Sequence, residues 1–153
     1  MKGISKVAPW WIALALVFSP CGSLPAAAGK DDSTESLRKN IESAFRSGSP
    51  KPFREICSPR DRIFLSLPGT GIPEGYVSRD QLHFHLERLF AVRKTLRFRF
   101  GPVSQSTAQR VRFATARWEY REEEKKDPGS MSLRFGFSRR GENWILSEIR
   151  ADS

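Results

Sequence analysis

Two histidines are the side chains in this sequence best suited to acid–base chemistry. His83 and His85 lie in a stretch with helical periodicity, where their side chains would point about 200° apart and could not share one metal ion. His85 borders the apolar stripe of that helix and could act as a general base in an interior pocket, with Tyr120 or Glu119 in support. The plainer interpretation is a histidine at the edge of the core that is hydrogen-bonded to a neighbour. We therefore assign no catalytic residue, no metal site and no cofactor.

Arginines alternate with aromatic residues in the C-terminal half of the chain. If the exposed faces of the strands align, four of them would form a basic stripe: Arg97, Arg99, Arg112 and Arg134. Such a stripe would attract anionic partners, including an anionic envelope surface. Aromatic and basic residues also alternate on nucleic-acid-binding surfaces, but any strand with one exposed face produces this pattern. We therefore do not expect a nucleic-acid partner.

The first 28 residues have the features of a secretory leader. Lys2 and Lys6 provide positive charge, residues 7–18 form an apolar run too short to span a bilayer, and residues 26–28 are the small alanines that signal peptidase needs. We expect cleavage near Ala28 and export to the periplasm or the medium. An uncleaved membrane anchor is a less favoured alternative. A lipoprotein attached through Cys21 is less favoured because a proline precedes that cysteine.

Cleavage would leave Cys57 as the single cysteine of the mature chain, so no internal disulfide could form. We interpret Cys57 as a small buried apolar side chain, with pairing between two chains as the alternative. The leader contains two lysines and no acid, and its loss lowers the net charge from +9 to +7. The remaining length suits one domain with a modest core.

Helical periodicity dominates the first half of the mature chain. A polar segment at 29–36, expected to be disordered, precedes the first helix, which Gly48 is placed to end. Ser78 and Gln81 form a capping box that opens the last helix. The predicted elements are helices at 37–48, 50–58 and 78–93 and a strand at 62–67, with a glycine- and proline-rich loop after the strand.

The apolar period changes to two after Leu96, which predicts four strands in a meander up to Ile149. We expect irregularities at Gly101-Pro102, inside the strand at 110–120, and just before Ile149. The apolar face of such a sheet must be covered, and the three helices are available to cover it. The predicted fold is α+β: one domain at 37–151, with three N-terminal helices packed on a strongly curved, mainly antiparallel, cone-like sheet.

Three stretches carry a resemblance to a known family: the helix at 37–48 with its Ser49-Pro50 corner, the helix entry at 76–82, and the hairpin and strand at 141–146. They resemble the nuclear transport factor 2-like superfamily, whose cone is also called cystatin-like. The corner lacks the aspartate of the family pattern. The resemblance covers nearly all of residues 33–151 and is greatest to small exported bacterial members of unknown function. The superfamily includes isomerases, dehydratases, cyclases and binding domains, so the fold does not give a function.

The resemblance carries expectations about the interior of the cone. The superfamily's steroid isomerases use a tyrosine on the first helix with carboxylic acids on the sheet, whereas the inward positions here are Leu37, Ile41 and Phe45. We therefore expect a non-enzymatic exported domain that binds a small apolar ligand in the cone or a protein partner on its sheet. The residues predicted to line the pocket are Phe45, Tyr76, His85, Trp118 and Tyr120.

Two other functions remain open from the sequence. One is a small lyase or isomerase that uses His85 as its general base. The other is a domain that binds anionic envelope surfaces through the arginine stripe. The resemblance also implies that two copies could pair through their sheets as a homodimer.

Overall fold

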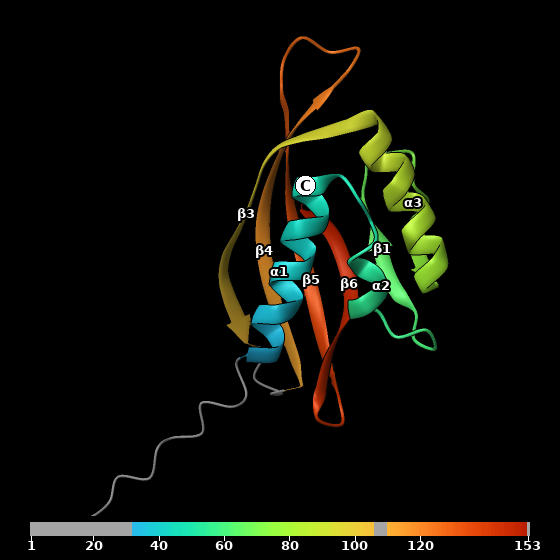
Figure 1. Cartoon of the computed structure of the whole chain (residues 1–153), viewed down its shortest axis with the longest axis vertical. Helices are drawn as coiled ribbons and strands as arrows, with labels where there is room; N and C mark the ends of the chain where they lie inside the picture. The colour runs from blue at the N-terminus through green and yellow to red at the C-terminus, as the bar shows by residue number, and fades with distance from the viewer. Residues whose placement is uncertain (1–31, 106–109, 153) are drawn as a thin grey trace, which may run out of the picture.

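One six-stranded sheet with the order β2-β1-β6-β5-β4-β3 curves around the helices (Figure 1). The computed structural model describes residues 32–105 and 110–152, and the predicted leader, its cleavage site and Cys21 lie outside them. The elements are α1 (Asp32–Ser47), α2 (Phe53–Ile56), β1 (Ile63–Ser66), β2 (Gly75–Val77), α3 (Arg79–Val92), β3 (Arg93–Gln105), β4 (Val111–Glu122), β5 (Gly129–Arg140) and β6 (Asn143–Asp152). Within the described residues, no helix is both long and apolar enough to span a bilayer.

The strand pairing confirms the predicted fold class. Strands β3 to β6 form an antiparallel meander, and β1 adds to β6 in the parallel direction. In Figure 1, α1 crosses in front of β4 and β5, while α2 and α3 lie toward β6 and β1. The face of the sheet toward the helices is called the inner face below, and the opposite face is called the outer face. The structure is therefore an α+β cone with helices on one side of a curved, unclosed sheet.

The N-terminal elements differ from the prediction in extent. Helix α1 begins at Asp32, so part of the segment at 29–36 is helical and not disordered. Two contacts stabilise this first part of the helix: Arg112 Nη1 donates a hydrogen bond to Thr34 Oγ1 (3.0 Å), and Glu35 pairs with Arg38 (2.9 Å). Helix α2 spans only Phe53–Ile56. The sequence did not predict β2, which pairs with β1 over three residues.

Register shifts occur where the chain must bend. The predicted irregularity at Gly101-Pro102 is confirmed by a shift between Phe100 and Val103, and the one before Ile149 by a shift opposite Ser147. The irregularity predicted inside β4 is wrong, because β4 pairs with β5 in unbroken register. Strand β4 needs no bulge because Phe113 simply lies on the outer face, opposite to the face of Trp118.

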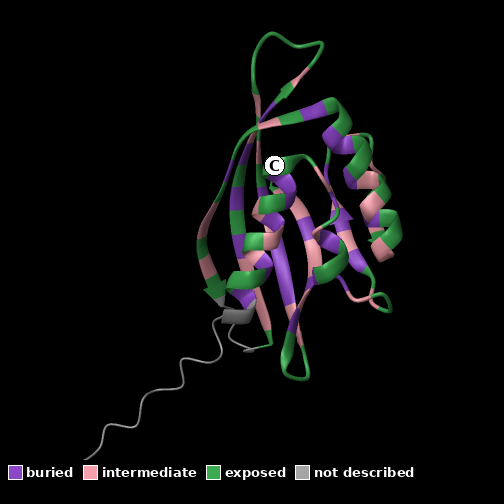
Figure 2. Ribbon diagram, viewed as in Figure 1, coloured by how far each residue is buried: buried purple, intermediate pink, exposed green. Residues whose placement is uncertain are grey.

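An aromatic cluster centred on Phe45 fills the space between the helices and the sheet. The Phe45 ring stacks on Phe98 with centroids 4.3 Å apart, and four further rings meet it edge-on: Phe53, Phe90, Trp118 and Phe135. The buried indole of Trp118 donates a hydrogen bond from Nε1 to Thr95 Oγ1 (2.9 Å), so its polar atom is satisfied. Figure 2 shows buried positions gathered on α1 and on the strands behind it. The protein's own rings therefore occupy the centre of the cone.

Truncation of the central ring should destabilise the whole domain. Phe45 is 1% exposed, and loss of a fully buried phenylalanine ring costs about 3–5 kcal/mol in unfolding free energy because it leaves a cavity. We expect Phe45→Ala to lose about this amount in urea denaturation. The matched control is Phe84→Ala on α3, whose ring is 54% exposed and should change stability by less than about 0.5 kcal/mol. Equal effects of the two variants would contradict the central role of Phe45.

Candidate functional site

The five residues predicted to line a pocket do not lie around one space. Phe45, Trp118 and Tyr120 are buried in the core, where Trp118 and Tyr120 are in ring contact (4.6 Å). Tyr76 is 67% exposed on β2 and lies on the outer face. His85 is half-buried on α3. The structure therefore separates these side chains into a packed interior, a helix edge and the outer face of the sheet.

The side chains of the enzymatic alternative are also separated. Glu119 lies between the inward-facing Trp118 and Tyr120, so it points to the outer face, where it is paired in register with Arg97. His85 lies on a helix that packs against the inner face, so the sheet stands between the two groups. Among the described residues, no group of three or more side chains converges to hold a metal ion.

Three of the four arginines predicted to form a stripe share the outer face. Arg97 and Arg99 flank the buried Phe98, and Arg134 lies between two buried residues of β5. Arg112 lies on the inner face instead, with its guanidinium carbon 4.7 Å from the centroid of the Trp144 ring. Arg112 therefore does not join the stripe.

Strand register brings further arginines to the same face. Arg117 lies directly opposite Arg99 across β3 and β4, and Arg150 lies directly opposite Arg134 across β5 and β6. We call these four residues the arginine patch. Like charges that face each other across two strands destabilise a sheet unless another group compensates them. The sequence pattern alone did not identify Arg117 or Arg150, because their positions opposite Arg99 and Arg134 depend on how the strands pair.

Small side chains separate the two pairs of arginines. Ser132 is paired with Arg117, and Thr115 is paired with Arg134. Neighbouring strands are about 4.8 Å apart, and successive outward residues of a strand about 7 Å apart. The long arginine side chains therefore flank a central area in which the side chains, those of Ser132 and Thr115, are short.

Two phenylalanines and one carboxylate order the β5–β6 side of the patch. The guanidinium carbon of Arg150 is 4.4 Å from the centroid of Phe64, and that of Arg134 is 5.4 Å from the centroid of Phe113. Both arginines also contact Glu148: Arg150 Nε forms an ion pair at 2.8 Å, and Arg134 Nη2 donates a hydrogen bond at 3.3 Å. One carboxylate thus balances two guanidinium groups, and one positive charge remains.

Gly136 provides the space for this arrangement. A Cβ atom at this position would lie 3.0 Å from the Cβ of Glu148 and 3.4 Å from the ring of Phe113. Tyr76 extends the aromatic row to the edge of the sheet, because its ring meets Phe64 edge-on at 5.2 Å. Aromatic and charged side chains therefore lie beside one another across the outer face from β2 to β4.

The β3–β4 side of the patch has little compensation. Within the described residues, the side chains of Arg97 and Arg99 make no hydrogen bond or ion pair, although their backbones belong to the β3–β4 ladder. Arg117 is exposed, donates to Ser130 Oγ at 3.3 Å, and has its nearest carboxylate, that of Glu119, at 3.8 Å. Exposed contacts at such distances contribute little free energy. The outer face therefore carries an excess of positive charge.

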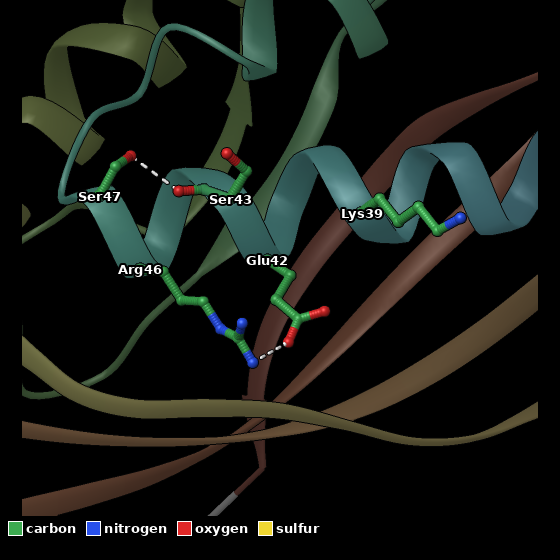
Figure 3. Close-up of a pocket in the computed structure, with 5 residues that line it drawn as sticks. All are labelled: Lys39, Glu42, Ser43, Arg46 and Ser47. Atoms are coloured by element: carbon green, nitrogen blue, oxygen red, sulfur yellow. Dashed lines mark hydrogen bonds and ion pairs between the residues drawn. The ribbon is translucent and has the colours of Figure 1, made fainter.

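The exposed side of α1 shows a different kind of surface (Figure 3). It holds a shallow depression of about 490 Å³ lined by Lys39, Glu42, Ser43, Arg46 and Ser47. Arg46 and Glu42 form an ion pair at 2.6 Å, one turn apart on the helix. Among the residues that the structure describes, no ring stacks on the cations of this depression, and Arg46 is paired with Glu42, as on an ordinary solvated helix.

Comparison with known proteins identifies the fold alone. No protein-family model matches the sequence, and no curated protein matches it. The structure is similar to that of a DUF4783 family protein from Bacteroides uniformis (TM-score 0.58, 10% identity, 76% of this chain and 96% of that chain). It is also similar to a protein named "Rd1NTF2_04 with long sheet" (0.57, 12%, 78% and 99%). A third similar structure, from Rhodopseudomonas palustris, is provisionally named an isomerase (0.59, 11%, 78% and 87%).

These likenesses define the architecture as an α+β cone. More specifically, the fold is the nuclear transport factor 2-like cone, as the resemblance in the sequence predicted. Identities this low indicate a shared fold and do not transfer an activity.

Cys57 should be inert at neutral pH. Burial raises the pKa of its thiol from 9.0 to about 12, and the nearby charge of Arg79 opposes this rise only in part. Because the folded pKa lies above the unfolded value, the thiol's contribution to stability is complete below pH 9 and is lost as the pH rises toward 12. We expect the difference in unfolding free energy between wild type and Cys57→Ala to shrink over this window in urea titrations. A constant difference would contradict the raised pKa.

Proposed function

We propose that this protein is a non-enzymatic binding domain that docks an acidic surface of a partner protein on the outer face of its sheet. The observation that carries the proposal is the two cross-strand arginine pairs of the arginine patch, whose charge Glu148 compensates only in part. A carboxylate-rich surface would compensate the rest. The proposal includes export from the cytoplasm, which rests on the leader-like first 28 residues alone.

The filled interior favours the sheet over the cone as the binding region. A small apolar ligand would need the space that Phe45, Phe98 and Trp118 occupy. The centroids of Phe98 and Trp118 lie 4.3 and 5.1 Å from that of Phe45. Displacing them would forfeit their burial and their ring contacts. The outer face requires no such rearrangement.

The composition of the outer face suits a protein interface. Arginine and aromatic residues are enriched in interface centres, and Tyr76, Phe64 and Phe113 supply apolar area beside the arginines. Stacking on Phe64 and Phe113 holds Arg150 and Arg134 in place before binding, which reduces the entropy lost on association. The excess positive charge would also accelerate encounter with an acidic partner.

Charge favours a foreign acidic partner over a second copy of the chain. Pairing of two outer faces would bring arginine patches together, and like charges at an interface oppose association. The homodimer and the anionic envelope surface are therefore the alternatives that the experiment must separate.

Neutralisation of the patch should weaken binding to an acidic polypeptide. We expect Arg117→Gln with Arg134→Gln to lower the affinity for poly-L-glutamate at least about tenfold at low salt, because charge-assisted hydrogen bonds are lost. The matched control is Lys39→Gln with Arg46→Gln on α1, which removes the same charge from the surface in Figure 3. Isothermal titration calorimetry, at two salt concentrations, measures both.

Three outcomes would contradict the proposal. Equal weakening in the control variant would mean that only net charge matters. Binding to phosphatidylglycerol vesicles and not to poly-L-glutamate, lost in Arg97→Glu with Arg99→Glu, would assign the face to a membrane surface. A concentration-dependent dimer in sedimentation that the patch variant disrupts would assign the face to self-association.

A further inference from the structure

A second surface feature lies on the helix side of the sheet and is independent of the arginine patch. It is a groove of about 500 Å³ between α1, α2 with the segment that follows it, the start of α3 and the first residues of β6. This volume is in the range of small-molecule sites in proteins. Because four separate parts of the chain form its walls, the groove is a product of the tertiary fold.

The floor of the groove is apolar. Leu37 from α1, Ile56 from α2 and Trp144 from β6 line it and are buried, and Ile145 beside them is half-buried. The Trp144 ring is held by Arg112, whose guanidinium carbon lies 4.7 Å from its centroid. A ligand on this floor would therefore contact a fixed aromatic wall and two aliphatic side chains.

One end of the groove carries a cation with an unused hydrogen-bond donor. Arg79 lines the groove, and its Nε is buried with no hydrogen-bond partner among the described residues. The nearest carboxylate oxygen, Asp80 Oδ1, is 3.8 Å away and belongs to an exposed side chain. The Arg79 side chain as a whole is 31% exposed and lines the groove, so its accessible part is open to a ligand. A buried guanidinium donor without an acceptor is unfavourable, and a carboxylate bound to the accessible part would supply the charge partner that the group lacks.

The surroundings of Arg79 reinforce its positive charge. Arg79 is the first residue of α3, directly after the N-cap Ser78, where the helix dipole adds partial positive charge. Arg54 also lines the groove and has no ion pair within the described residues. Glu55 is the acid that lines the same groove, and it would repel a ligand with several negative charges.

We propose that this groove binds a small organic monocarboxylate with an apolar body. The carboxylate would accept hydrogen bonds from the Arg79 guanidinium, and the apolar body would lie over Leu37, Ile56 and Trp144. Glu55 selects against polyanions, and the apolar floor selects against inorganic anions. A neutral amphiphile would leave the donor of Arg79 without a charged acceptor.

Octanoate is a suitable probe, with 1-octanol and inorganic phosphate as comparison ligands. In amide-detected NMR titrations of the folded domain, octanoate should shift the signals of the groove residues saturably. The indole signal of Trp144 should move, while that of Trp118, which donates to Thr95 inside the core, should stay. We expect 1-octanol and phosphate each to bind at least about tenfold more weakly than octanoate. The alcohol lacks the carboxylate that Arg79 would bind, and phosphate lacks the apolar body that would cover the floor.

The variant Arg79→Gln should weaken octanoate binding at least about tenfold. The control is Arg88→Gln on the same helix, which lies outside the groove and contacts Phe84; it should leave the affinity unchanged. Thermal denaturation of both variants verifies that they fold. Unsaturable shifts, equal binding of 1-octanol or of phosphate, or the same affinity for the two variants would each overturn the proposal. None of these results depends on the outer face, so the two proposals fail separately.

Discussion

The contact of the Phe45 ring with its neighbours is the constraint on which the rest of the structure depends. This one side chain of α1 touches α2 through Phe53, α3 through Phe90, and the sheet through Phe98, Trp118 and Phe135. The helices therefore cannot be repositioned independently of the sheet, because any shift would open a void beside the ring. The same packing leaves the centre of the cone to the protein's own side chains, so binding chemistry is found at the surface.

Aromatic rings also determine where the positive charge of the chain resides. Lysine and arginine number 26 against 17 acids, so ion pairs alone cannot neutralise the cations. Four arginines on the two faces of the sheet also lie over rings: Arg93 over Tyr120, Arg112 over Trp144, Arg134 over Phe113 and Arg150 over Phe64. Arg93, Arg134 and Arg150 combine this stacking with a carboxylate partner. Stacking keeps the guanidinium groups ordered without cancelling their charge. On the outer face, stacking on rings orders Arg134 and Arg150. In the groove, the cation is Arg79, whose Nε is buried.

Periodicity in the sequence was sufficient for the elements that have a long apolar face. It predicted the positions of α1 and α3, the four-strand meander, and the bends at Gly101-Pro102 and before Ile149. It could not find β2, because three residues around Gly75 and Tyr76 carry no period and are ordered only by β1. Alternation with Trp118 does place Arg112 on the inner face, so that signal was available. The sequence holds no such signal for the pairing of Arg117 with Arg99, because that pairing depends on the register between strands.

The parallel pairing of β1 with β6 has a consequence for the order in which the molecule can be completed. Ile63 and Leu65 of β1 are fully buried, yet apart from the three-residue β2 their strand has its partner only in the last strand of the chain. Closing so long a loop is entropically costly and slow, and it must await the C-terminal residues. Arg150 and Phe64 meet only across this pair. The β1–β6 part of the outer face therefore requires the C-terminal strand, and a nascent or truncated chain lacks it.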